Sequence, residues 1–380
     1  MQKRVWWKYL LGVVLALVVG AYLRYWAALM LPVDFDEPIY LRAGQDYAAL
    51  IEARDWQGIR DYAYNYEHPP FFKLVYGATL TTRPPIEDME GRLIAPLEYA
   101  RRIDADEVVT FVQTRMVSVL LGTLSVLLVA LVDPLAGFFL AVHTYAIKYS
   151  AQIYLEALPL LTSTVVVLAY IRSKRRWNGW LAISALALGL TAASKYLYCV
   201  VAFPVLIDWA LAVIGERRSK DQVPHPLLRI AGMIGWGLLG VGVFVLADPY
   251  LWQSGTERLG ESLFFSVLYS QGAHVAESGY PFFQPFVWLL MPVPWHPIAI
   301  YTALDGFTTI LACFGVPRMW KERRVIVLWW VLGMLFLLVW STKWPQYILI
   351  VTVPVTLCAA EGARQVWAWI PDSVRKRSTA

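Results

Sequence analysis

Two short polar stretches hold most of the side chains that could carry out chemistry. One is Asp34-Phe35-Asp36-Glu37-Pro38, just after the first long apolar run, and the other is Glu67-His68-Pro69-Pro70, followed by Lys73. A carboxylate can take a proton from an attacking hydroxyl or amine, and a lysine or arginine can bind a phosphate. We therefore expect acid–base chemistry beside a phosphate-bearing ligand, with the surrounding apolar segments forming a site for a lipid.

Each stretch also has a simpler structural interpretation. Pro38 favours a helix start, so Asp36 and Glu37 could cap that helix and complement its dipole. Pro69 and Pro70 would lead into an amphipathic helix whose Lys73 reaches lipid phosphates. The position of Asp36 and Glu37 favours a catalytic role over capping, because they lie a few residues beyond the first apolar run, at the level of the lipid headgroups.

The composition predicts an all-α polytopic integral membrane protein. Of 380 residues, 58% are hydrophobic and only 16% are charged, whereas soluble domains carry about a quarter charged residues. Apolar runs of spanning length recur along the chain and predict about ten transmembrane helices. The first run lacks a small-residue cleavage site, so it is interpreted as a retained helix. The runs lie near 9–30, 114–132, 135–149, 155–171, 177–193, 197–214, 228–247, 298–316, 325–340 and 347–360.

The positive charges predict the orientation. A cytoplasmic N-terminus places every basic cluster on the same side, as the positive-inside rule requires, and both termini are then cytoplasmic. The clusters are Lys3/Arg4/Lys8, Arg172/Lys174/Arg175/Arg176, Arg217/Arg218/Lys220, Arg318/Lys321/Arg323/Arg324 and Arg375/Lys376/Arg377. The three cysteines fall inside predicted spans and indicate neither a disulfide framework nor a metal cluster.

The opposite side is acidic. Residues 31–107 contain fifteen Asp and Glu against eight Lys and Arg. We expect them to form an extracytoplasmic catalytic loop with juxtamembrane helices, and residues 248–297 to form a second extracytoplasmic loop. The whole chain, 1–380, would be a single membrane domain. This charge asymmetry reflects membrane polarity and gives no evidence of nucleic-acid binding.

The order of the motifs resembles the protein O-mannosyltransferases and the related aminoarabinose transferases, which are GT-C class glycosyltransferases using polyprenyl-phosphate sugars. Asp36-Glu37 after the first span and His68-Pro69-Pro70 with Lys73 begin this resemblance. It continues along most of the chain with Arg115-Met116-Val117-Ser118, Tyr149-Ser150-Ala151-Gln152 with Glu156, Lys195-Tyr196, and Lys343 to Tyr347. The last turn reads Lys-Trp-Pro-Gln-Tyr where many relatives place His and Arg, so one cationic contact is in question.

The resemblance implies inverting transfer of a sugar from a polyprenyl-phosphate donor, with Asp36 as general base and Glu37 beside it. The residues expected to bind the donor phosphate are Arg42, Lys73, Arg115, Lys195, Lys343 and Tyr347. The residues expected to line the acceptor or donor site are Glu67, His68, Asp248 and His274. Arg42 could instead pair with Asp46 one helical turn on, and Lys343 could anchor at the interface beside Trp344. The acceptor, whether protein, lipid or glycan, stays open.

A divalent metal and two other functions remain as alternatives. Glu67 and His68 could bind such an ion with Asp36 or His274, but two adjacent ligands define no site, and no cofactor is predicted. A transporter would carry charges in the middle of its spans and inverted repeats, whereas these spans look almost free of charge. A non-catalytic lipid-binding subunit would have the same bundle and would differ only in lacking transfer activity.

Overall fold

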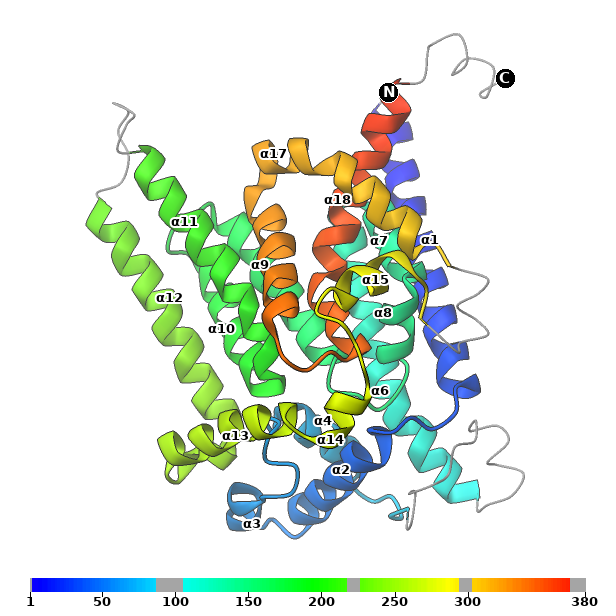
Figure 1. Ribbon diagram of the computed structural model, residues 1–380, viewed down its shortest axis with the longest axis vertical. Coiled ribbons are helices and arrows are strands. Elements are labelled where there is room, and N and C mark those ends of the chain that lie inside the picture. The colour runs from blue at the N-terminus through cyan, green and yellow to red at the C-terminus, as the bar shows by residue number, and fades with distance from the viewer. Residues whose placement is uncertain (1, 87–104, 217–225, 294–302, 370–380) are drawn as a thin grey trace.

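The computed structural model describes residues 2–86, 105–216, 226–293 and 303–369, and within them every regular element is helical. Figure 1 shows two layers: a bundle of long upright helices, and shorter helices lying across one end of it. The bundle is built from α1 (Gln2–Met30), α6 (Ala105–Ala130), α9 (Ala157–Ser173), α10 (Gly179–Ser194), α11 (Ala202–Glu216), α12 (Pro226–Ala247), α17 (Asp305–Val339) and α18 (Leu349–Trp369).

The bundle is that of an integral membrane protein. Five stretches are long and apolar enough to cross a bilayer, namely Trp6–Met30, Asp106–Ala130, Tyr196–Ile214, Leu227–Ala247 and Pro345–Trp369. In the most apolar part of Pro345–Trp369, 94% of the residues are buried, whereas in that of Leu227–Ala247 only 17% are buried. Pro345–Trp369 therefore forms the centre of the bundle. Leu227–Ala247 presents most of its apolar surface outward, where lipid would cover it.

Three of the predicted spans differ from the single straight helices expected, since one is divided and two are joined. The run near 135–149 is divided into α7 (Pro134–Val142) and α8 (Thr144–Tyr149), because His143 between them is extended. The runs near 298–316 and 325–340 are joined from Asp305 onward in α17, which departs from helical geometry at Arg323. Figure 1 shows α17 as an arch. Residues 298–302 lie outside the described part, and ten spans stay a prediction.

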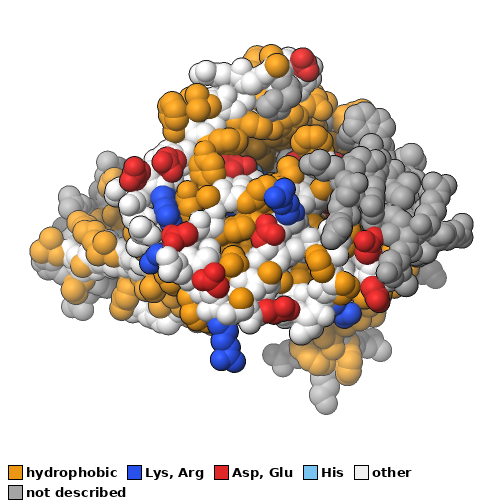
Figure 2. Space-filling model, turned by 90° about the horizontal axis from the view of Figure 1, so that it is seen from below, with side chains coloured by type: hydrophobic (Ala, Val, Ile, Leu, Met, Phe, Trp, Pro, Cys, Tyr) orange, Lys and Arg blue, Asp and Glu red, His pale blue; other side chains and the backbone are white. Residues whose placement is uncertain are grey.

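The second layer comes from the two segments predicted as external loops. The first contributes α2 (Glu37–Glu52), α3 (Trp56–Asp61) and α4 (Phe71–Leu80). The second contributes the 3-10 helix η2 (Pro249–Trp252), α13 (Gly255–Ser270) and α14 (Ala273–Glu277), while α15 (Gln284–Leu290) lies alongside the bundle and packs against α17. α2, α3, α4 and α13 lie at the end of the bundle opposite the first residues of α1 and the last of α18 (Figure 1). Seen from below, acidic side chains are spread over this face (Figure 2).

The spans hold more buried charge than the sequence interpretation allowed. Arg24, six residues before the last residue of α1, is fully buried. Its guanidinium donates to Ser150 Oγ at 2.9 Å and to the carbonyls of Gly20, Leu140 and Ala141. Asp208 of α11 is likewise buried and paired with arginines. The expectation of nearly charge-free spans was wrong for Arg24 and Asp208, because partners from neighbouring segments allow each charge to stay buried inside the bundle.

Candidate active site

A cavity of about 150 Å³ lies between the two layers. Its lining comes from the start of α2, the segment before α4, the turn between α10 and the 3-10 helix η1 (Tyr196–Val201), α13, and the turn that leads into the 3-10 helix η3 (Pro345–Ile348). Five of the residues predicted from the sequence meet here: Asp36, Glu67, His68, Lys195 and Tyr347. They come from four segments of the chain and are brought together only by the fold.

Asp36 lies at the N-cap position of α2, but its side chain does not cap that helix by a hydrogen bond. The capping interpretation therefore does not describe its carboxylate. Burial raises the pKa of Asp36 to about 7, and the nearby Lys195 ammonium opposes that rise. A half-buried carboxylate with a pKa near neutrality is well suited to accept a proton at physiological pH.

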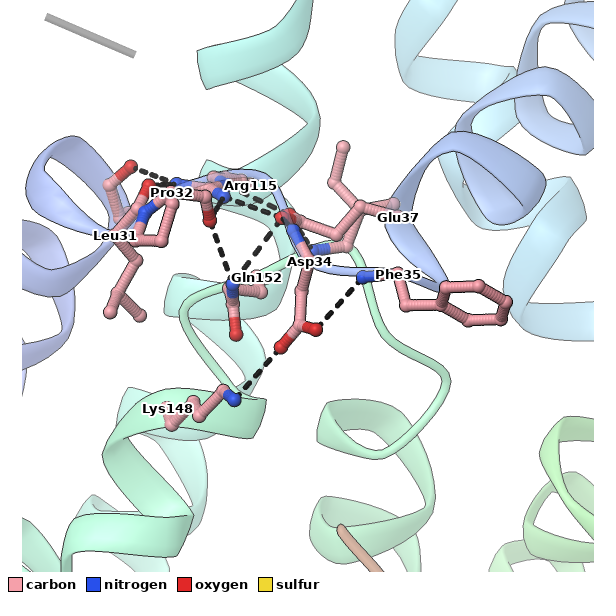
Figure 3. A network of polar contacts seen from close by, with 10 residues as sticks. Leu31, Pro32, Asp34, Phe35, Glu37, Arg115, Lys148 and Gln152 are labelled. Carbon is pink, nitrogen blue, oxygen red and sulfur yellow. Dashed lines mark hydrogen bonds and ion pairs between the residues drawn. The ribbon is translucent and has the colours of Figure 1, made fainter. Parts of the chain in front are cut away.

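Glu37, the next residue, has a different environment. Figure 3 shows its carboxylate in a network with Arg115 and Gln152. Arg115 donates through Nε to Glu37 Oε1 at 2.8 Å and through Nη2 to Oε2 at 2.5 Å, and both side chains are fully buried. The amide N–H groups of Asp34 and Ile153 also donate to Glu37, at 2.9 and 2.7 Å. This carboxylate is thus fully occupied by structural contacts.

Arg115 holds the chain between α1 and α2. Besides Glu37 it binds three carbonyl oxygens, those of Ala28, Leu31 and Pro32, at 2.8 to 2.9 Å. Neither Arg115 nor Glu37 is among the described residues that line the cavity. Both were predicted as site residues, and the structure instead places them behind Asp36, where they fix the start of α2.

A second contact constrains the same segment. Lys148 Nζ lies 2.8 Å from Asp34 Oδ2, and Asp34 Oδ1 accepts the Phe35 amide at 2.8 Å (Figure 3). Asp34 and Glu37, on either side of Asp36, are therefore both anchored to the bundle. This leaves Asp36 as the carboxylate of the motif that faces the cavity.

Lys195 is the one lysine or arginine among the described residues lining the cavity. Its ammonium contacts the Glu156 carboxylate and lies 5.3 Å from the centre of the Tyr347 ring. Burial raises the pKa of Glu156. Glu156 Oε2 is buried and accepts no hydrogen bond within the described residues. The sequence offered one signal for this pair, an isolated glutamate at the start of an apolar run, but it was not assigned a role.

The other predicted cations lie elsewhere. Arg42 is exposed on α2, 4.0 Å from Asp46, with its guanidinium over the Tyr64 ring. Lys73 is buried, and its ammonium donates to the carbonyls of Asn65 and His68 at 2.6 and 2.8 Å. Lys343 contacts the carbonyls of Leu338 and Trp340 at the end of α17. None of the three lines the cavity, because each ammonium or guanidinium is used in a local structural contact.

The residues expected to line the acceptor or donor site are also divided. Glu67 and His68 reach the cavity, where burial and the charges of Lys195 and Lys73 lower the pKa of His68 well below its ordinary value. Asp248 is buried outside the cavity lining, and burial raises its pKa to about 7. His274 belongs to α14, but its side chain is outside the described part. Among the described residues, no group of three or more His, Cys, Asp or Glu could hold a metal ion.

Aromatic and amide side chains complete the cavity, and sequence reasoning did not identify them. Tyr40, Trp340 and Gln346 all line it. The Trp340 indole N–H is buried and has no acceptor in the described part of the chain, so it is a hydrogen-bond donor available to a ligand. Trp340 was interpreted as the last residue of a span, and only the turn after α17 brings it over the cavity.

Comparison with known proteins supports the fold. No protein-family model matches the sequence, and no curated protein matches it either. Two structures of ArnT from Cupriavidus metallidurans do match. The one bound to undecaprenyl phosphate has 15% sequence identity, a TM-score of 0.54, and coverage of 94% of this chain and 60% of ArnT. The apo structure has 15% identity, a TM-score of 0.58, and coverage of 97% and 62%.

The chain therefore spans about three fifths of the length of the ArnT chains it matches. ArnT is an aminoarabinose transferase of the GT-C class. The resemblance predicted from the sequence is confirmed at the level of the fold, since this degree of identity supports the fold alone.

Proposed function

We propose that this protein is a membrane glycosyltransferase that moves a sugar from a polyprenyl-phosphate donor to a hydroxyl or amine acceptor. One observation carries the proposal. An aspartate with a pKa near 7 and a buried lysine line one aromatic cavity, at the end of a membrane bundle whose fold is shared with a protein seen bound to undecaprenyl phosphate.

The reaction is a single displacement in which Asp36 is the general base. Its carboxylate takes the proton from the acceptor oxygen or nitrogen as that atom attacks the anomeric carbon of the sugar. The bond from the anomeric carbon to the phosphate oxygen breaks, and the electron pair leaves with the polyprenyl phosphate. One attack on the face opposite the leaving group inverts the configuration at the anomeric carbon.

Lys195 is the cation that we assign to the leaving phosphate. Charge grows on that phosphate as the sugar departs, so an ammonium held in a buried site stabilises the transition state more than the bound donor. Glu156 and the Tyr347 ring hold the ammonium in place. The Trp340 indole N–H is a further donor for the phosphate or for a sugar hydroxyl. Of the six residues predicted to bind the phosphate, this assignment retains Lys195 and Tyr347. Arg42, Lys73, Arg115 and Lys343 have no part in it.

The membrane orientation is part of the same proposal. The cavity lies between the bundle and the layer formed by the described parts of the two acidic segments, and the described basic clusters lie toward the other end, at the start of α1, between α9 and α10, and where α17 bends. By the positive-inside rule the cavity faces the extracytoplasmic side, and both termini are cytoplasmic. Polyprenyl-linked sugars would then reach the cavity from the outer leaflet.

Replacement of the proposed base tests the function. Purified protein is incubated with a panel of polyprenyl-phosphate sugars and acceptors, and release of polyprenyl phosphate is measured. We expect Asp36→Asn to lower turnover by about 10²- to 10⁴-fold, the usual contribution of a general base. Asp46→Asn is the matched control, since it removes a carboxylate from the same helix outside the cavity lining, and it should keep wild-type turnover.

The alternatives predict other outcomes of this assay. If the protein is a non-catalytic lipid-binding subunit, the wild type and Asp36→Asn would both bind the donor, and neither would release polyprenyl phosphate. A transporter would move a substrate across a sealed vesicle without breaking the sugar–phosphate bond. Wild-type turnover in Asp36→Asn would remove Asp36 from the mechanism.

A further inference from the structure

A second cavity, of about 200 Å³, lies at the opposite end of the bundle. The cavity is formed by the turn between α9 and α10, by α11, and by the bend of α17. Its lining includes Tyr170, Lys174, Arg175, Asp208, Arg323 and Arg324. None of these residues takes part in the proposed transfer reaction, and the cavity is separate from the one that contains Asp36.

One buried carboxylate organises this cavity. Asp208 Oδ2 accepts from Arg175 Nε and Nη2 at 2.9 and 2.7 Å, and from the Tyr170 hydroxyl at 2.7 Å. Asp208 Oδ1 accepts from Arg324 Nε at 3.0 Å. A single carboxylate thus holds two guanidinium groups from different elements near each other, and its charge neutralises only one of them.

Two further cations have no such partner. Lys174 and Arg323 line the cavity and are exposed, and no ion pair of either one is found within the described residues. The remaining carboxylate of the lining, Glu322, accepts from Arg318 at 2.8 Å, on its own helix and outside the lining. Four cations therefore face two carboxylates, and the cavity carries a positive excess that an anion would neutralise.

The backbone at this cavity departs from regular geometry in both segments that bring the cations. Lys174 and Arg175 have φ angles of 53° and 57°, the left-handed region that side chains other than glycine rarely adopt. Arg323 has φ −145° and ψ 59° inside the otherwise helical α17. Such conformations cost energy and concentrate at binding sites. Membrane orientation by the positive-inside rule needs only the charges, and it does not explain a cavity built around a buried aspartate.

We propose that this cavity binds a phosphate group, held by Lys174 and Arg323 with Arg175 and Arg324 fixed behind them by Asp208. Guanidinium groups bind phosphate through paired hydrogen bonds, and a lysine adds a point charge. Basic pockets between membrane helices commonly take phosphorylated headgroups. The phosphate belongs either to an anionic lipid of the adjacent leaflet or to a soluble anion. The site is independent of the transfer reaction.

Binding is tested on the full-length protein with two probes. One is phosphatidic acid in phosphatidylcholine nanodiscs, with retained lipid counted by native mass spectrometry, and the other is inorganic phosphate at constant ionic strength, with the unfolding temperature as readout. The test variant is Lys174→Ala with Arg323→Ala. The matched control is Arg176→Ala with Lys321→Ala, which removes the same charge from the same two segments outside the cavity lining.

We expect the test variant to weaken binding of at least one probe by about tenfold or more, as loss of two charge-assisted contacts implies. The control should stay within about twofold of wild type, since remote surface charges contribute little. An effect on phosphatidic acid alone identifies a lipid headgroup, and an effect on inorganic phosphate alone identifies a soluble ligand. Equal loss in both variants would show general surface electrostatics and overturn the proposal, as would no binding of either probe to the wild type.

Discussion

Asp36 and Glu37 are adjacent carboxylates in different environments. The Glu37 carboxylate is neutralised by Arg115 and fully hydrogen-bonded, whereas Asp36 faces the cavity and its pKa is raised to about 7 by burial. In the proposed reaction, carboxylates whose environments differ in this way divide the work, with Glu37 holding the structure and Asp36 exchanging the proton. The difference comes from the partner of each side chain.

The pH dependence of turnover is the first prediction at this scale. A base must be ionised, so kcat/KM should rise with pH, with a tenfold gain per unit below about pH 7, and level off above it. A pH–rate profile on the purified protein with a polyprenyl-phosphate sugar measures this rise in kcat/KM. The residual activity of Asp36→Asn should not show the rise. A profile that is flat from pH 5 to 8 in the wild type would contradict the assignment.

Stability gives a second prediction for the same residue. The folded-state pKa of Asp36 lies above its ordinary value of 3.8, so ionised Asp36 destabilises the fold above pH 7, and this penalty shrinks as the pH falls toward 4. Asp36→Asn should therefore be more stable than wild type at pH 8, by about 1–2 kcal/mol for a half-buried group, and the gap should narrow at pH 5. Thermal unfolding in detergent at the two pH values checks this. A variant less stable at pH 8 would contradict it.

At the scale of elements, the ion pair between α2 and α6 fixes the start of α2. Arg115 from α6 reaches Glu37 and the carbonyls that connect α1 to α2. It thereby fixes the backbone that precedes Asp36. Arg42, only five residues beyond Glu37, is exposed and makes a surface contact with Asp46. The two arginines were predicted to bind the same phosphate, but the structure gives them different environments.

Removal of the two guanidinium groups should therefore have unequal effects. Arg115→Met leaves Glu37 as a buried charge without its partner, which typically costs about 3–5 kcal/mol. Arg42→Met breaks an exposed pair worth at most about 1 kcal/mol. Unfolding temperatures of the two purified variants, compared with wild type, check the contrast. Equal losses in both would show that the buried network does not hold the start of α2.

At the scale of the whole molecule, α18 lies at the centre of the bundle and packs closely against α17. A Cβ on Gly315 of α17 would overlap the carbonyl oxygen of Cys358, and one on Gly362 of α18 would overlap that of Leu311. These two glycines allow the two backbones to approach each other. By contrast, a Cβ on Gly237 of α12 would meet nothing within 4 Å.

Alanine substitution should separate these two environments. Gly315→Ala forces α17 away from α18 and should cost about 1–3 kcal/mol. Gly237→Ala lies in an open helix position and should be neutral or stabilising by up to about 1 kcal/mol. Thermal unfolding of both variants in the same detergent gives the comparison. If Gly315→Ala unfolds like wild type, the close approach of the two helices is wrong.

We expect the turn after α2 to face the extracytoplasmic side and the turn after α9 to face the cytoplasm. A membrane-impermeant maleimide applied to intact cells should label a cysteine replacing Arg54, in the turn after α2, and spare one replacing Arg176, in the turn after α9. The three native cysteines are first replaced by alanine. Permeabilised cells are the control, and both sites should react there. Labelling of Arg176→Cys in intact cells would reverse the orientation.

The sequence was enough to identify the class of this protein and the acidic end of the bundle, where the structure places the cavity lined by Asp36. Apolar runs of bilayer length and a basic-to-acidic asymmetry are properties of the chain itself, so they identified a helical membrane protein and located the acidic segments without knowledge of packing. Short motifs likewise pointed to Asp36, Glu67, His68, Lys195 and Tyr347, which the fold brings into one cavity. The helix break at His143 was not visible, because the predicted apolar run 135–149 continues through it, whereas the break at Arg323 lies in the basic stretch between two predicted runs.

Which charged residues are available to a ligand depends on packing in three dimensions and could not be predicted from the sequence. A lysine has the same sequence signature whether its ammonium contacts carbonyls, as in Lys73 and Lys343, or lies at a cavity, as in Lys195. The free energy of a buried charge is set by partners that are distant in the chain, such as Ile153 for Glu37 or Glu156 for Lys195. Those partners meet through packing of α2, α6, α9 and α10, which is a property of the folded bundle.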